Sequence, residues 1–159
     1  MKKPKIFLDT TIISYLFKPD KPEKETESNL LWEHIIAGEY EVVLSNEVLR
    51  EINNCEEPKR QKMNDMLKKI EYVEIKLNSE IVELANEIIR LGILKEKNRS
   101  DSLHIACAIY SNCDQLISWN FSDLVNPKTV MGIWKMSLLY EWSALEIISP
   151  FSLRLREEK

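Results

Sequence analysis

Cysteine is scarce in this chain of 159 residues, and its three copies form no paired motif. Their number is odd and no Cys-x-x-Cys spacing occurs, so we expect a protein of a reducing compartment. Cys107 lies inside an apolar helical run, where a small buried side chain fits. With 44% hydrophobic residues, the chain can bury a core as one domain over residues 1–159 without disulfides or a structural metal.

Long apolar runs are also missing from the sequence. No stretch approaches the roughly 18 residues that a membrane span needs. The N-terminal segment has a basic start and some apolar residues, but Asp9 interrupts it and no small-residue cleavage site follows. The sequence has no internal repeat, no low-complexity segment and no linker between domains. We therefore expect a single cytoplasmic domain that makes no contact with a membrane.

An excess of basic residues is absent as well. The formal net charge is -4 at pH 7, whereas a protein that coats nucleic acid nonspecifically needs a field of Lys and Arg. A nuclease is not excluded, because acids gathered at a metal site lower the total charge. Two local clusters can either meet phosphates or lie on solvated faces: Lys59, Arg60 and Lys62, and Lys95, Lys97 and Arg99.

Short apolar runs alternate with helical patterns along the chain, which predicts an α/β sandwich with a mainly parallel sheet. Pro19 and Pro22 predict a loop, and Ser28 is expected to cap the next helix. The polar residues 95–101 are expected to form a loop before a buried helix. The predicted strands are 5–8, 41–44, 72–75, 116–118 and 146–148. The predicted helices are 10–17, 29–37, one capped by Ser45, one starting at Pro58, 79–91, 102–110 and 127–139.

Carboxylates stand at the turning points of this alternation. Asp9 ends the first apolar run, Glu51 follows the second, and Asp101 opens the buried helix. Each alone has a structural explanation, since Asp9 and Asp101 can be helix N-caps and Glu51 can lie on an exposed helix face. A parallel sheet, however, gathers such positions at its carboxyl edge, where oxygen ligands suit a hydrated cation. Together they predict a metal site and chemistry on phosphate.

Four segments carry a more specific pattern: FLDTT around Asp9, SNEVLREI at 45–52, DSLHIACA at 101–108 and LISWNFSD at 116–123. Over the whole chain, the sequence resembles the PIN-domain ribonucleases, including the VapC-like toxins of prokaryotic toxin–antitoxin pairs. The most specific part of the resemblance is the D-x-x-H-I-A-x-A helix followed by LISWN. It implies a PIN-like three-layer sandwich, in which helices flank a small mainly parallel sheet with an acidic cleft at its carboxyl edge.

The resemblance also implies an activity and partners. The activity is an endoribonuclease that hydrolyses RNA phosphodiester bonds with Mg²⁺ or Mn²⁺. The implied partners are an RNA substrate, an antitoxin protein and a second copy of the chain in a homodimer.

Residue by residue, the resemblance assigns four positions to catalysis: Asp9, Glu51, Asp101 and Asn120. At the fourth position many relatives have aspartate. An amide oxygen can ligate a hard cation, but it adds no charge and cannot act as a base. Asp123 lies one helical turn further on and is either a compensating ligand or a surface charge. The expected metal ligands are Asp9, Glu51, Asp101 and Asp123, and the number of metals stays open.

Several neighbours of the acids have two interpretations. Thr10 and Thr11 can cap a helix or hold a phosphate. His104 lies one turn after Asp101 and is expected to be packed and hydrogen-bonded rather than catalytic. Trp119 is expected to pack in the core or at its rim rather than to stack on a base.

Two other functions compete with the nuclease. A phosphatase or dehalogenase also begins its site with an aspartate after the first strand, but the phosphatase motif needs a second Asp where Thr11 stands. A PIN-like binding subunit that has lost catalysis is supported by Asn120 alone and is opposed by the retained acids. Metal binding separates these functions, because such a subunit should show no Mn²⁺-dependent change in melting temperature.

Overall fold

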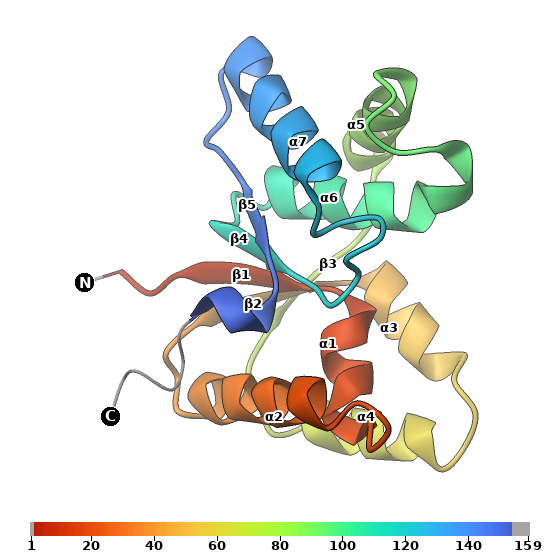
Figure 1. Cartoon of the computed structure of the whole chain (residues 1–159), viewed down its shortest axis with the longest axis vertical. Helices are drawn as coiled ribbons and strands as arrows, with labels where there is room; N and C mark the ends of the chain where they lie inside the picture. Colours follow the sequence, from red (N-terminus) through yellow and green to blue (C-terminus); the bar gives the residue numbers. More distant parts are fainter. Residues whose placement is uncertain (1, 154–159) are drawn as a thin grey trace.

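The structure is a computed structural model that describes residues 2–153, and it confirms the predicted α/β sandwich (Figure 1). Five strands form one sheet with the order β3-β2-β1-β4-β5. Every neighbouring pair is parallel. The strands are β1 (Lys5–Leu8), β2 (Glu41–Ser45), β3 (Val73–Ile75), β4 (Gln115–Ile117) and β5 (Glu146–Ile148).

The direction in which strands are added reverses at β1. The chain moves outward from β1 to β2 and β3, then returns to add β4 and β5 on the other side of β1. Because parallel crossovers are right-handed, this reversal sends the connecting helices to opposite faces, as Figure 1 shows. One group is α1 (Thr10–Ser14), α2 (Pro22–Ile36), α3 (Asn46–Asn53) and α4 (Lys59–Leu67). The other is α5 (Ser79–Arg90), α6 (Arg99–Tyr110) and α7 (Pro127–Tyr140).

Short 3-10 helices complete the described chain and lie next to longer helices or to the last strand. They are η1 (Tyr15–Phe17), η2 (Glu96–Asn98) and η3 (Pro150–Leu153).

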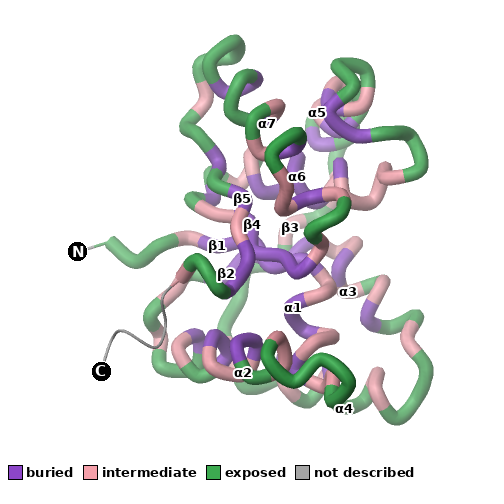
Figure 2. The backbone as a smooth tube through the Cα atoms, viewed as in Figure 1, coloured by how far each residue is buried: buried purple, intermediate pink, exposed green. Residues whose placement is uncertain are grey.

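The core is centred on β1 and its neighbours, as the buried segments in Figure 2 show. Ile6, Phe7 and Leu8 have no exposed surface, because a central parallel strand is covered on both faces. Helix α6 is buried along most of its length, including Cys107. The apolar run of β1 is followed at once by Asp9, which is only 2% exposed. A charged side chain so placed needs dedicated partners, and it has them at the site described below.

Local signals in the sequence fix several element ends as predicted. Asp9 caps α1 by accepting a hydrogen bond from the Thr11 N–H at 3.1 Å. Ser45 caps α3 by accepting from the Val48 N–H at 3.1 Å. Gly38 ends α2 with a φ of +83°, a conformation that costs glycine little.

Two predicted helix starts are wrong. Helix α2 begins at Pro22 rather than near residue 29, because proline lacks an N–H and has a fixed φ, both of which suit the first turn of a helix. Ser28 is therefore no cap, and its hydroxyl donates to the Lys24 carbonyl at 2.8 Å. Helix α6 begins at Arg99, so Asp101 lies in its first turn and is not its N-cap.

Among the described helices, none is long and apolar enough to cross a bilayer. The three cysteines are free thiols. Burial raises the pKa of both Cys107 and Cys113 to about 12, so these two thiols stay protonated and unreactive at neutral pH.

Candidate metal centre

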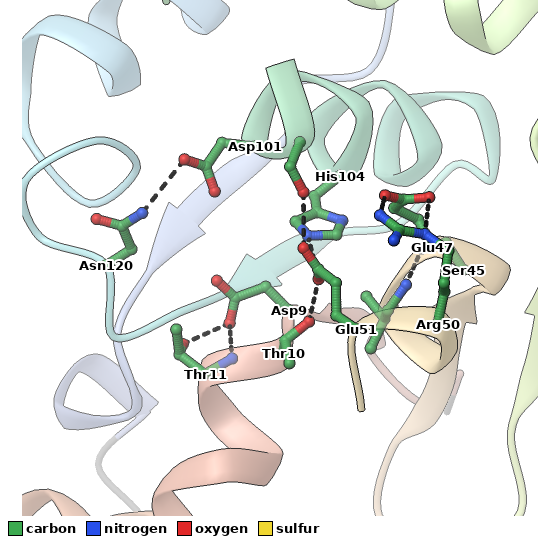
Figure 3. A network of polar contacts seen from close by, with 12 residues as sticks. Asp9, Thr10, Thr11, Ser45, Glu47, Arg50, Glu51, Asp101, His104 and Asn120 are labelled. Carbon is green, nitrogen blue, oxygen red and sulfur yellow. Dashed lines mark hydrogen bonds and ion pairs between the residues drawn. The ribbon is translucent and has the colours of Figure 1, made fainter. Parts of the chain in front are cut away.

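The acidic residues meet at the carboxyl edge of the sheet, where the strand order reverses. Asp9 directly follows β1, and Asn120 follows β4, the strand beside it. Helices α3 and α6 contact one another and bring Glu51 and Asp101 to the same edge, as Figure 3 shows. Open parallel sheets bind ligands at this kind of switch point. The structure thus brings the predicted residues of four separate segments into one place.

Asp9 is anchored by short polar contacts on both of its oxygens. Its Oδ2 accepts from the Ser118 hydroxyl at 2.5 Å, and its Oδ1 accepts from the Thr11 hydroxyl at 2.5 Å and from the Thr11 N–H. Burial raises the pKa of Asp9 above its ordinary value, although these hydrogen bonds act to lower it. Asp9 is therefore a fixed carboxylate whose negative charge is incompletely compensated.

Glu51 is held from three sides. Its Oε1 accepts from the Thr10 hydroxyl and lies 3.2 Å from the His104 Nε2, and its Oε2 accepts from the Ser100 hydroxyl at 2.8 Å. Burial acts to raise the pKa of Glu51, but the hydrogen bond and charge of His104, followed by Thr10 and Ser100, bring it down to about 2. Glu51 is consequently ionised over the whole physiological range.

His104 is packed and hydrogen-bonded, as the sequence predicts. Its side chain is 4% exposed, and its ring centroid lies 5.8 Å from that of Phe7. Burial favours the neutral ring, but the hydrogen bond and charge of Glu51, together with the charges of Asp9 and Asp101, raise the pKa of His104. The Nδ1 atom has no hydrogen-bond partner among the described residues. His104 thus positions Glu51 and does not face the open part of the site.

Asp101 is the least compensated of the three acids. Within residues 2–153, its one side-chain partner is the Asn120 amide, whose Nδ2 donates to Oδ2 at 3.3 Å. Partial burial is the largest cause that raises the pKa of Asp101 to about 6. His104 opposes this shift, whereas the negative charges of Asp9, Asp123 and Glu51 add to it. A positive charge placed between these acids would relieve their repulsion.

The orientation of Asn120 follows from its hydrogen bonds. Its Oδ1 accepts from the Asp123 N–H and from the Ser122 hydroxyl, each at 3.0 Å. Because a backbone N–H can only donate, the amide oxygen must face the 120–123 turn and the amide nitrogen must face Asp101. In this arrangement Asn120 is a hydrogen-bond donor to an acid rather than an oxygen ligand. Asp123 lies close enough to influence Asp101 electrostatically.

The chemistry of the donors fits a hard divalent cation with a partly hydrated shell. An ionised carboxylate has about four lone-pair positions. The protein occupies three on Asp9, three on Glu51 and one on Asp101. In residues 2–153, no three His, Cys, Asp or Glu side chains are grouped so as to hold an ion directly. Mg²⁺ commonly uses one or two carboxylates and keeps several waters, and Asp101 keeps the most oxygen positions free for such an ion.

Two serines lie in the site although no sequence pattern predicts a role for them. Ser118 contacts Asp9 and also accepts from the Asn120 N–H at 2.9 Å, while Ser100 contacts Glu51. Ser118 directly follows a buried strand next to β1, which is the signal that could have identified it. Ser100 has no comparable signal, because its segment was predicted to be a loop.

Trp119 packs in the core, as predicted, and is 3% exposed. Its indole N–H donates to the Ser28 hydroxyl at 2.7 Å. Its ring stacks on Tyr15, with centroids 6.1 Å apart. Trp119 therefore fixes the start of the loop that carries Asn120 and is not available to a base.

Asn120→Asp is expected to tighten Mn²⁺ binding and to destabilise the protein in the absence of metal. The substitution replaces a donor to Asp101 with another negative charge, and Asp9, Glu51 and Asp123 already repel that group. Calorimetric titration with Mn²⁺ and melting in EDTA measure the two effects. Asp123→Asn is the companion variant and should weaken binding if Asp123 compensates. Unchanged affinity in both variants would make both residues structural.

The chain is similar to known proteins both in sequence and in fold. The sequence model of the family described as PIN domain matches residues 5–122, a segment that contains all four predicted catalytic positions. No curated protein matches the chain significantly.

Two solved structures share the fold. The structure of VapBC2 from Rickettsia felis bound to a DNA fragment from their promoter matches with a TM-score of 0.54 and 17% identity, and covers 91% of this chain and 98% of that chain. The structure of Mycobacterium tuberculosis VapC20, a toxin that cleaves the sarcin-ricin loop, matches with a TM-score of 0.56 and 16% identity. It covers 74% of this chain and 91% of that chain.

Proposed function

This chain belongs to the PIN-domain family, and on that premise we propose that it is a divalent-metal-dependent endoribonuclease that acts as the toxin of a toxin–antitoxin pair. Asp9, Glu51, Asp101 and Asn120 form its catalytic centre in this proposal. Mg²⁺ or Mn²⁺ is the cofactor. Asp9 and Asp101 hold the cation, and Glu51 and Asp123 contribute charge around it.

The observation that carries the proposal is the uncompensated charge at the switch point of the sheet. Asp101 has a pKa of about 6 because it is partly buried and close to other acids. A fold does not keep such repulsion for stability, and perturbed acids of this kind cluster at functional sites. A divalent cation is the simplest ligand that relieves it, and RNA phosphate is a substrate that such a cation attracts.

Each residue of the proposed catalytic centre has a separate role. A bound cation would supply positive charge against the scissile phosphate and would activate water for attack. Asp9 supplies a fixed oxygen because Ser118 and Thr11 hold it. Glu51 has a pKa of about 2, so it accepts hydrogen bonds and contributes charge but takes up no proton at neutral pH. The Asn120 amide orients Asp101 through the hydrogen bond to its Oδ2.

The proposal extends to partners and location. An antitoxin protein is proposed because the VapBC2 structure, which is named for a pair, shares the fold over most of both chains. Cleavage of RNA is proposed because the VapC20 structure, which has the same fold, is of a toxin that cleaves the sarcin-ricin loop. A homodimer is proposed because α7 exposes apolar side chains, with Leu138 60% and Leu139 74% exposed. Cytoplasmic action agrees with the free cysteines.

A PIN-like subunit without catalysis is the second candidate, and one observation favours it. The Asn120 amide nitrogen, rather than an oxygen, faces Asp101, which lowers the number of oxygen ligands. Such a subunit would bind RNA or an antitoxin but would show no stabilisation by Mn²⁺. The phosphatase alternative still lacks its second aspartate, because Thr11 stands at that position. The Thr11 hydroxyl and N–H both donate to Asp9.

Purified protein is expected to cleave RNA with Mg²⁺ or Mn²⁺ and to be inactive in EDTA. Asp9→Asn and Glu51→Gln should each lose most of this activity, because one removes a proposed ligand and the other removes a fixed negative charge. Gel analysis of labelled RNA measures the cleavage, and protein purified in parallel from the inactive variants controls for contaminating nuclease. Cleavage that persists in EDTA would contradict metal dependence.

A further inference from the structure

A polar pocket of about 190 Å³ opens between the start of α6, the start of α7 and the loop that joins β4 to α7. Its charged lining residues are Lys95, Lys97, Lys128 and Asp123. Lys95 and Lys97 come from the segment around η2, and Lys128 is the second residue of α7. Three lysines from two distant parts of the sequence therefore line one small cavity.

The lysines of this pocket are free to meet a ligand. Within the described part of the chain, none of the three forms an ion pair. Arg99, their neighbour in the sequence, is committed instead: its guanidinium binds Glu96 at 2.8 Å and also contacts Asn86. In the sequence, Lys95, Lys97 and Arg99 form one basic cluster. In the structure, Arg99 is paired with Glu96, whereas the two lysines have no ion-pair partner among the described residues.

Asp123 links the pocket to the acidic centre. This residue lines the pocket and also acts electrostatically on Asp101. Asn126 closes another side of the pocket and caps α7 by accepting from the Thr129 N–H at 3.0 Å. Asn98 precedes α6, and its side chain makes no capping hydrogen bond. The Arg99 N–H at the start of α6 donates to the Glu96 carbonyl instead, so the positive charge of the pocket comes from its lysines.

A polyanionic substrate needs a local positive charge to bind this acidic protein. The chain carries a formal net charge of -4, and its acidic centre repels phosphate until a cation is bound. Three lysines beside the acids supply local attraction where the overall charge does not. Ile93 and Leu94 form the apolar part of the pocket wall, and its other lining residues are polar or charged and include the three lysines, which suits an anionic group.

We propose that the pocket formed by Lys95, Lys97 and Lys128 binds a backbone phosphate of the RNA strand, next to the phosphodiester held at the acidic centre. The inference rests on the proposed ribonuclease function and adds to it a second anchoring point. The lysines position the strand and do not take part in bond cleavage. Phosphate contacts carry no sequence information, so the pocket should act on RNA of any sequence.

The test measures the affinity of the full chain for a short fluorescein-labelled single-stranded RNA in EDTA, where cleavage is absent. The triple variant Lys95→Ala, Lys97→Ala, Lys128→Ala is expected to bind more than about tenfold more weakly, and the slope of log K against log salt should fall by about 0.7, since the pocket holds one phosphate and each phosphate contact on a single strand contributes about 0.7. Fluorescence anisotropy at several salt concentrations gives both values.

The matched control is the triple variant Lys68→Ala, Lys69→Ala, Lys76→Ala, whose lysines are exposed around the end of α4 and β3. Both triple variants change the formal net charge from -4 to -7, since each removes three positive charges. The control should bind RNA within about twofold of the parent and keep its salt slope. Surface lysines contribute little to folding, and melting curves of both variants verify this. Equal weakening by the two triple variants would overturn the pocket as a binding site.

Cleavage assays separate failure of the pocket from failure of the function. With Mn²⁺ and the same RNA, the pocket variant should show a raised KM and an unchanged kcat. If the parent cleaves RNA and both triple variants bind equally, the pocket is refuted and the nuclease stands. If the parent cleaves no RNA but the pocket variant selectively loses binding, the pocket stands and the nuclease is refuted. If the parent neither binds RNA at low salt nor cleaves it with Mn²⁺, both are refuted.

Discussion

Asp101→Asn is expected to lower the rate of Mn²⁺-dependent RNA cleavage by roughly 10²–10³-fold, the range seen when one preorganised charge-stabilising group is removed from an active site. Of Asp9, Glu51 and Asp101, Asp101 has the fewest oxygen lone pairs occupied by side chains or backbone of residues 2–153. The substitution keeps the size of the side chain and an oxygen that can accept from Asn120. The loss would therefore come from the missing charge, and labelled-RNA cleavage under single-turnover conditions measures it.

A control substitution shows whether the loss of cleavage comes only from the change in net charge. Asp65→Asn removes one carboxylate from the exposed face of α4, where Asp65 contacts Gln61 and Lys68. It should leave cleavage unchanged within the error of the assay. Undiminished cleavage by the Asp101→Asn protein, with contaminating nuclease excluded, would remove Asp101 from the proposed centre.

The same substitution is expected to stabilise the metal-free protein. The pKa of Asp101 is about 6 in the folded protein, against an ordinary value of 3.8. Because the folded state binds this proton more tightly than the unfolded state, stability is lost as the pH rises from about 4 to about 6. The shift sets an upper limit of about 3 kcal/mol, which solvent screening around a half-buried carboxylate reduces to roughly 1–2 kcal/mol. Asp101→Asn should abolish this loss.

Melting in EDTA at several pH values measures the effect. At pH 7 the variant should melt roughly 2–8 °C above the parent, and the difference should vanish near pH 4. Saturating Mn²⁺ should reverse the order, because a ligand at a hundredfold excess over its Kd stabilises the parent by about 2.7 kcal/mol and the variant by less. Equal Mn²⁺-induced shifts in parent and variant would mean that Asp101 is not a ligand.

The position of the centre could be predicted from the sequence because it depends on simple rules. A buried parallel strand reads as an unbroken apolar run, so Leu8 followed by Asp9 locates the carboxyl end of β1 without any structure. The start of the apolar helix similarly locates Asp101 to within one turn. Sheet topology then brings these residues together, since the carboxyl ends of adjacent parallel strands share one edge.

Contacts between side chains could not be predicted in the same way. The pairing of His104 with Glu51 depends on how α3 and α6 pack, and one sequence holds no signal for that packing. The orientation of Asn120 depends on a backbone N–H three residues later. The lysine pocket needs Lys128 to approach residues about thirty positions earlier in the sequence. Each of these features comes from tertiary packing rather than from local propensity.

The proposed ribonuclease function requires a cation between Asp9 and Asp101. Crystals grown with Mn²⁺ and measured near the manganese absorption edge test this requirement directly, because anomalous difference density locates the ion without assumptions about activity. The account predicts one strong peak in contact with both carboxylates in the parent protein, and no peak there in the Asp101→Asn protein. A map without density between Asp9 and Asp101 at saturating Mn²⁺, or with its only peak elsewhere, would contradict it.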